Sequence, residues 1–314
     1  MRFDYTAVGF HTFDALCHPV NSIPPNGDTF FVDDFAIAIS GAAGAAAVVA
    51  AKHGLSVQAV GGLGEDLMGD WVLNRMHDFR INTDLMVRCP GYATSSSIVT
   101  TRPDGQRPAL HKKGATGAFF VEDDQIDSVL DTKILHIGGV GLIDRMDPAR
   151  NAEIFKEAKK RGCITTLDVF AATSDDLKLV KPLLENTDYF MPSEIEAMAL
   201  SGMTDFEDIA KFLLDFGTKA VVMTLGENGV MYRDAAGNCI DLPAFDIEVV
   251  CTCGCGDCFN AGFATGIHLN EPIDKCLKLG QAAAAQNSMG LGSQAIIKDL
   301  STTINFLENT PSRS

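Results

Sequence analysis

Short apolar runs alternate with longer amphipathic segments along most of this 314-residue chain. The runs are rich in β-branched residues and lack polar alternation, as expected for strands covered on both faces. They begin near residues 5, 57, 134, 163, 189 and 220. The segments 45–54, 147–162 and 204–217 have helical spacing and each ends at glycine, a common helix stop. Strands and helices in alternation predict an α/β sandwich with a largely parallel sheet.

Two stretches differ from this pattern and predict a second, smaller sheet. Residues 28–40 place Phe35, Ile37 and Ile39 on one face at a period of two, and residues 92–112 indicate a hairpin around Asp104-Gly105. With lid strands contributed by about 12–40 and 92–112, the sheet would project from a single domain spanning residues 1–314. Such a lid excludes water from a transfer reaction. The alternative is a pair of surface hairpins without a catalytic part.

Composition narrows the range of partners. The formal net charge of −16 disfavours nucleic acid and anionic membrane surfaces. The sequence has no apolar run long enough for a membrane helix and no signal-peptide pattern at its start, so we expect a cytoplasmic protein. Nine cysteines in a chain of this size are expected to be reduced thiols. The last residues, 308–314, are expected to fray.

The strongest candidate for chemistry is the segment 252–259, which reads TCGCGDCF. Two glycines before a small, apolar helix predict a tight turn whose bare N–H groups converge on an anion. Asp257 follows in the first helical turn. Phosphoryl transfer needs both parts, donors for the phosphate and a carboxylate that takes the hydroxyl proton. The alternative is a helix that Asp257 simply caps.

This segment resembles the signature D-T-x-G-A-G-D-x-F of the ribokinase-like carbohydrate kinases, the PfkB family. Gly254, Gly256, Asp257 and Phe259 match it in place. The resemblance implies a three-layer α/β/α sandwich with a small β-sheet lid. It also implies that Asp257 is the catalytic base and that the amides of Gly254, Cys255 and Gly256 form the anion hole.

Further matches follow in the family's order along nearly the whole chain: Gly9 with Asp14, residues 40–44, 61–66 with Gly69, Gly114-Ala115, 191–196 and 224–229. They imply that Asp14 and Gly41 bind the acceptor, that Glu196 holds Mg²⁺ through water, and that ATP is the donor. Ser193, Thr224, Gly226, Gly229 and Asn287 would contact the nucleotide. Taken without the resemblance, Glu196 is equally a solvated helix carboxylate and Asp14 a loop or capping residue.

Three positions depart from the family pattern. Cys251 replaces the Asp that helps to form a monovalent-cation site, and a thiol is a poor ligand for a hard cation, which argues against activation by K⁺. Ala45 occupies the place of an Asn that donates to substrate hydroxyls, so the acceptor pocket is expected to be altered. Ser193 replaces an Asn, and its shorter hydroxyl can still make a hydrogen bond.

Cys251, Cys253, Cys255 and Cys258 crowd around the same turn. Their spacing lacks the second pair of a zinc or iron–sulfur site, so we interpret them as small buried residues. Cys255 would lie at a helix N-terminus, where thiol pKa values fall. We therefore expect its oxidation or alkylation to inactivate the protein.

Together these features predict ATP-dependent phosphorylation of a hydroxyl on a small sugar or sugar-like substrate. A nucleoside kinase of the adenosine or pseudouridine type is an alternative, and a non-catalytic nucleotide or sugar sensor is another. The altered positions 45, 193 and 251 favour the sensor, whereas the intact Gly-x-Gly-Asp core argues against it. The exposed edges of the lid strands also suggest a homodimer.

Overall fold

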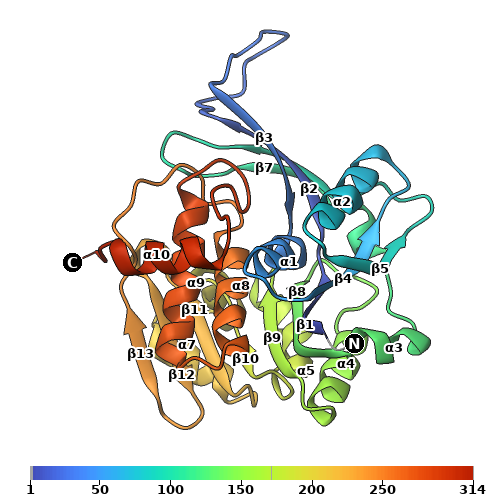
Figure 1. Ribbon diagram of the computed structural model, residues 1–314, viewed down its shortest axis with the longest axis vertical. Helices are drawn as coiled ribbons and strands as arrows, with labels where there is room; N and C mark the ends of the chain where they lie inside the picture. Colours follow the sequence, from blue (N-terminus) through green and yellow to red (C-terminus); the bar gives the residue numbers. More distant parts are fainter. Residues whose placement is uncertain (1–2, 171, 314) are drawn as a thin grey trace.

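The computed structural model describes residues 3–170 and 172–313, in which helices cover both faces of a large sheet (Figure 1). The strands of this sheet are β1 Phe3–Gly9, β4 Val57–Leu63, β5 Asn82–Arg88, β8 Thr132–Val140, β9 Ile164–Val169, β10 Tyr189–Phe190, β11 Ala220–Thr224, β12 Val230–Asp234 and β13 Cys239–Leu242. Their order is β13-β12-β11-β10-β9-β8-β1-β4-β5. Among the described strands of this sheet, only the pairs β11–β12 and β12–β13 are antiparallel. The predicted largely parallel α/β sandwich is confirmed.

The helices divide into two layers, each with its own core. One layer contains α1 Ala42–Lys52, α2 Leu67–Asp78, α8 Cys255–His268 and α9 Ile273–Ser288, with α10 Leu300–Asn309 packed on α9. The other contains α3 Ile126–Val129, α4 Ala149–Lys160, α5 Leu177–Leu184, α6 Glu194–Ser201 and α7 Phe206–Leu214. In β1, Tyr5 and Ala7 face the first core and Val8 faces the second. Strands that supply both cores must be apolar at successive positions.

A separate four-stranded sheet projects at the top of Figure 1. It comprises β2 Thr12–His18, β3 Asp34–Ser40, β6 Ser96–Thr100 and β7 Ala109–Lys112, in the order β3-β2-β6-β7. The first strand of the predicted pair is shorter than expected, because residues 28–33 form no strand. The inner face carries Leu16, Ala38 and Val99, which pack against the cysteine turn. The outer face exposes Phe35, Ile37, Ile98 and Leu110.

The helix pair α8 and α9 fixes the turn that precedes α8. A Cβ at Gly262 of α8 would lie 2.6 Å from the Leu279 carbonyl oxygen of α9, so the two backbones approach as closely as glycine allows. Both helices are rich in small residues, which explains this close packing. The turn at 252–256 therefore rests on a rigid support.

The expectation that residues 308–314 fray is wrong for the part described. Residues up to Asn309 belong to α10, and Ser312 then forms an antiparallel bridge with Phe245. The reason is that Asp246 N donates to Pro311 O at 2.9 Å and Arg313 N donates to Ala244 O at 2.8 Å. This segment, residues 310–313, thus runs beside the loop that follows β13.

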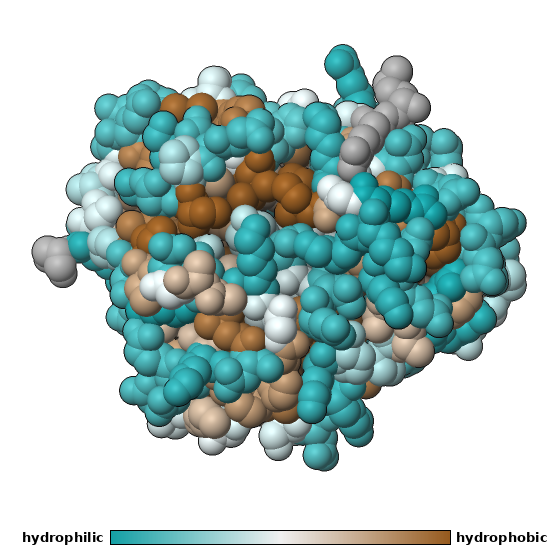
Figure 2. Space-filling view, turned by 90° about the horizontal axis from the view of Figure 1, so that it is seen from below, coloured by the Kyte–Doolittle hydropathy of each residue, from teal (hydrophilic) through white to brown (hydrophobic). Residues whose placement is uncertain are grey.

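The molecular surface agrees with the acidic composition. Viewed from the side opposite the small sheet, Figure 2 shows mainly hydrophilic side chains, with hydrophobic ones gathered in a few patches. Among the described residues, every helix is too short or too polar to cross a lipid bilayer.

Candidate functional site

The turn before α8 has the geometry of an anion-binding site. Gly254 is left-handed, with φ 74°, and a Cβ there would lie 2.5 Å from Ser293 Oγ. The first amides of a helix have no partner within it, and a Cβ at Gly256 would meet no atom within 4 Å. Open space therefore lies beside Gly256 in the first turn of α8, where the helix dipole favours negative charge; the Cys255 amide donates to Thr252 O at 3.4 Å.

Asn287 at the end of α9 holds this turn in place. Its Nδ2 donates to Cys253 O at 2.7 Å and to Cys255 Sγ at 3.3 Å, while its Oδ1 accepts from Gln294 N at 2.6 Å. The side chain is fully buried. Its polar atoms are thus engaged with the protein, and a contact of Asn287 with nucleotide stays a prediction.

Asp257 lies in the first turn of α8, beside those amides. Burial raises the pKa of its carboxyl group to about 6; Arg107 lowers this pKa, whereas the charges of Glu196 and Asp14 raise it. A pKa near the working pH suits a general base. The simple capping role is not seen, because Gly254 is the N-cap residue and no side chain accepts a capping hydrogen bond there.

Asp14 approaches the same turn from strand β2 of the small sheet. Its Oδ2 lies 3.9 Å from Cys253 Sγ, and its Oδ1 accepts from Thr12 Oγ1 at 3.4 Å. Burial raises the pKa of Asp14, while hydrogen bonds from Ser97 and Ser40 and the nearby His111 lower it. His111 of β7 is in turn 3.0 Å from Ser97 Oγ. The sequence carried no motif at His111, and only its place on the predicted hairpin could have marked it.

The other predicted acceptor residues lie at the start of α1. Gly41 has φ 84°, and a Cβ there would be 2.5 Å from Phe10 O. That carbonyl accepts from Ala43 N and Gly44 N, each at 3.1 Å, which orients the helix start. Ala45 is fully buried, so a contact with an acceptor stays a prediction.

Three carboxylates, from β9, α6 and α8, influence one another's charge without forming a close cluster among the described residues. Glu196 Oε2 accepts from Ser193 Oγ at 2.7 Å and from Ser193 N at 2.9 Å, a capping box that starts α6. Burial raises the pKa of Asp168, at the end of β9, well above its ordinary value, and the charges of Glu196 and Asp257 raise it further. Sequence reasoning missed Asp168; its position at the end of a buried strand was the available signal.

These oxygen donors fit Mg²⁺ held through water. The charges of Glu196 and Asp257 raise the pKa of Asp168, and the charge of Glu196 raises the pKa of Asp257, so the three carboxylates lie near one another. Mg²⁺ prefers oxygen ligands and retains several waters. Within residues 3–170 and 172–313, no three His, Cys, Asp or Glu side chains are close enough together to bind a metal ion. Bridging water would therefore have to complete the coordination.

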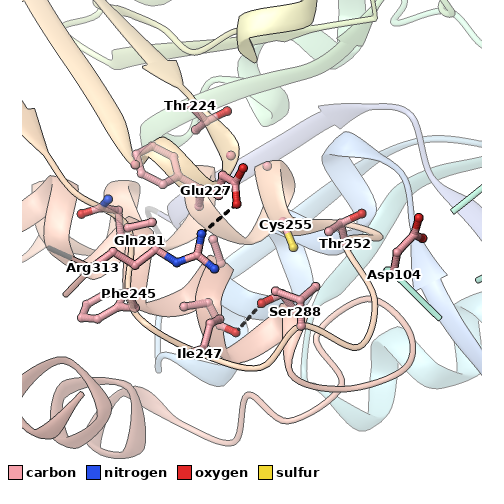
Figure 3. Close-up of a pocket in the computed structure, with 18 residues that line it drawn as sticks. Asp104, Thr224, Glu227, Phe245, Ile247, Thr252, Cys255, Gln281, Ser288 and Arg313 are labelled. Carbon is pink, nitrogen blue, oxygen red and sulfur yellow. Dashed lines mark hydrogen bonds and ion pairs between the residues drawn. The ribbon is translucent and has the colours of Figure 1, made fainter. Parts of the chain in front are cut away.

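A cavity of about 370 Å³ extends away from the turn (Figure 3). Predicted nucleotide residues Thr224, Gly226 and Gly229 line it together with Cys255 and Gly256. Gly229 has φ 99°, and a Cβ there would lie 2.0 Å from Leu242 O. Ser193 forms a bridge with Thr224 and so lies next to this loop. Apolar side chains supply part of the remaining wall: Phe245, Ile247, Val249, Phe259, Ala284 and Ala285. Polar and charged side chains supply the rest: Asp104, Glu227, Thr252, Gln281, Ser288 and Arg313.

The hairpin between β6 and β7 closes over the turn. Thr252 Oγ1 donates to Gly105 O at 3.2 Å, and Thr101 Oγ1 lies 3.4 Å from Cys251 Sγ. Arg107, on the same hairpin, is near enough to lower the pKa of both Asp257 and Glu196. Nothing in the sequence marked this cation, because residue 107 carried no motif.

The expectation that the Cys255 thiol is acidified is wrong. Burial raises its pKa to about 11, although the hydrogen bond from Asn287 and the charge of Arg107 lower it. Desolvation thus outweighs the helix N-terminus. Burial likewise raises the pKa of Cys253 to about 12. All nine cysteines are free thiols.

Comparison with known proteins agrees with this geometry. The family model described as pfkB family carbohydrate kinase matches residues 18–299. The chain is 26% identical over 286 residues to an ATP-dependent 6-phosphofructokinase of Thermoanaerobacterium thermosaccharolyticum, covering 88% of this chain and 87% of that protein. It is 25% identical over 289 residues to a ribokinase of Haemophilus influenzae, covering 90% and 92%.

Solved structures show the same fold. Arabidopsis thaliana ribokinase complexed with ribose and ATP superposes with a TM-score of 0.83 at 24% identity, covering 98% of this chain and 99% of that one. A putative ribokinase II from E. coli in complex with ATP and Mg²⁺ gives 0.82 at 20% identity, covering 98% and 99%. With the family match spanning most of the sequence, the chain belongs to the pfkB family of carbohydrate kinases, phosphotransferases that act on hydroxyl groups.

Proposed function

We propose that the protein transfers the γ-phosphoryl group of ATP to a hydroxyl of a small sugar or sugar-like acceptor. One observation carries this proposal: the Asp257 carboxyl, with a pKa raised to about 6 chiefly by burial, lies in the first turn of α8, next to the open space at Gly256. A base and an anion hole next to each other are what in-line phosphoryl transfer requires. A sensor would gain nothing from this pairing.

In the proposed reaction Asp14 holds acceptor hydroxyls on the lid side of the turn. Asp257 accepts the proton of the attacking hydroxyl as its oxygen bonds to the γ-phosphorus and the bond to ADP breaks. The amides of Gly254, Cys255 and Gly256 stabilise the charge on the transferring group, and Arg107 adds a positive charge from above. Mg²⁺ near Glu196 and Asp168 would neutralise charge on the donor phosphates.

The small sheet is proposed to act both as a lid and as a subunit interface. Its outer face exposes Phe35 by 64%, Ile98 by 55% and Leu110 by 70%, and β3 and β7 are its edge strands. Single-sided sheets with apolar outer faces are commonly covered, and a second copy supplies a self-complementary face. Light scattering should give a dimer mass, and Ile98→Lys should give a monomer; a monomeric parent protein would refute this part.

The proposed activity is tested by measuring ADP release from ATP and Mg²⁺ with sugars, sugar acids, sugar phosphates and nucleosides as acceptors. We expect one acceptor class to accelerate release far above the rate without acceptor. The rate should be the same in K⁺ and Na⁺, because Cys251 replaces the usual Asp. Acceleration by nucleosides alone would establish the nucleoside kinase instead. ADP binding without acceleration by any acceptor would contradict catalysis.

A further inference from the structure

The segment 310–313 brings a charged side chain to the nucleotide cavity. Phe306 of α10 packs edge-on against Phe245, with ring centroids 5.3 Å apart. Beyond the helix, Pro311 O and Arg313 N are hydrogen-bonded to Asp246 N and Ala244 O. These contacts hold the backbone of residues 311–313 against the loop that follows β13. They bring the Arg313 side chain to the wall of the cavity.

Arg313 lines the cavity and pairs with Glu227 of the glycine loop. Its guanidinium NH1 is 2.9 Å from Glu227 Oε2, and its side chain is 36% exposed against 77% for Glu227. Glu227 and Arg313 come from elements on different walls of the cavity, and Figure 3 shows the pair reaching toward each other across it. A surface ion pair of this kind contributes little to stability, so folding alone does not explain its place.

The pair lies away from the phosphate end of the cavity. In Figure 3, Arg313 and Gln281 are on the side of Cys255 opposite to Thr252 and Asp104. Beside Arg313, Figure 3 shows the aromatic ring of Phe245 and the amide side chain of Gln281. A nucleotide whose terminal phosphate meets the amides of Cys255 and Gly256 must extend its nucleoside along this cavity, because that is where the enclosed space continues.

We propose that Arg313 binds the nucleoside part of the phosphoryl donor, with Glu227 holding its guanidinium in position. A planar guanidinium stacks on aromatic rings and donates up to five hydrogen bonds, which suits a base in a cavity with partly apolar walls. Glu227 orients the guanidinium and keeps it from turning to solvent. This inference rests on the proposed function only in placing a nucleotide in the cavity; it requires no turnover.

The experiment compares two probes, ADP and inorganic tripolyphosphate, by titration calorimetry in the presence of Mg²⁺. Arg313→Ala should weaken ADP binding about tenfold, the equivalent of one stacked cation, and should leave tripolyphosphate binding unchanged. Glu227→Gln should give a smaller loss for ADP only. Arg161→Ala is the matched control. Arg161 is also an ion-paired arginine, but it directly follows α4 and does not line the cavity. An unchanged melting temperature shows that each variant folds.

The outcomes separate the inference from the proposed function. Unchanged ADP affinity in Arg313→Ala overturns the inference and leaves the proposed function intact. Equal losses for ADP and tripolyphosphate also overturn it, because Arg313 would then contact phosphate. Binding of neither probe by the parent protein contradicts both. Weaker ADP binding with unchanged tripolyphosphate binding establishes Arg313 as a donor-nucleoside contact.

Discussion

Replacing Arg107 with alanine should lower both the ionised fraction of the proposed base Asp257 and the stabilisation of the transferring phosphoryl group. Arg107 lowers the pKa of Asp257, which burial raises to about 6. Removing a nearby positive charge raises the pKa of a carboxyl group by about one unit. The ionised fraction of Asp257 at pH 6 would then fall from about one half to about one tenth. The rate at acidic pH should therefore fall, because only the carboxylate form of Asp257 accepts a proton.

The second consequence is a slower transfer step at every pH. Losing one donor or cation aimed at developing charge costs about 10²- to 10³-fold in kcat. A pH profile separates the two effects, since the transition-state loss lowers the plateau while the pKa change moves the acid limb. Arg107→Lys keeps the charge and should keep the acid limb near its parent position.

The assay is ADP release measured from pH 5 to 9 with saturating acceptor. Arg102→Ala, on the same hairpin and exposed, is the control and should leave the profile unchanged. An acid limb that stays in place in Arg107→Ala would refute the electrostatic coupling of the lid to Asp257.

Four further changes probe the turn, the metal site and the Cys255 thiol. Gly254→Ala should lower the free energy of unfolding by about 1–3 kcal/mol in urea titrations, because φ is 74° and Ser293 Oγ lies 2.5 Å from the new Cβ. Gly256→Ala should fold normally, because the new Cβ has no atom within 4 Å, yet it should lose ADP release. Equal stability of the two variants would contradict this prediction. Glu196→Gln should raise the Mg²⁺ concentration for half-maximal rate several-fold, and an unchanged value would remove Glu196 from the metal site. Iodoacetamide should label Cys255 slowly at pH 7.5, since burial raises the pKa of its thiol to about 11. Labelling should stop turnover. Full activity of the labelled protein would contradict a place for Cys255 in the anion hole.

Local sequence signals were sufficient for the turn and the loops that build the cavity. Gly254 and Gly229 are required by backbone geometry, because both have a positive φ and a Cβ at either would lie too close to a neighbouring atom, so their positions are readable from sequence. Asp257 follows the turn directly, and the small apolar residues after it predict the helix that carries it. The alternating elements likewise predicted the large sheet, because strands buried on both faces are continuously apolar.

Contacts between distant segments could not be predicted in the same way. Asp168 ends a strand almost 90 positions before Asp257, and one carboxylate on a buried strand carries no periodic signal. Arg107 and Arg313 act from a hairpin and from the segment after α10, where surface arginines are common. The raised pKa of Cys255 depends on burial by surrounding elements, which no local motif encodes.

The central claim is that Asp257 takes the proton of the acceptor hydroxyl. Asp257→Asn preserves the size of the side chain and removes the base. The account predicts that kcat for acceptor-stimulated ADP release falls by about 10²- to 10⁴-fold, while calorimetry gives the parent protein's affinity for ADP. Turnover retained within a few-fold by Asp257→Asn would contradict the account.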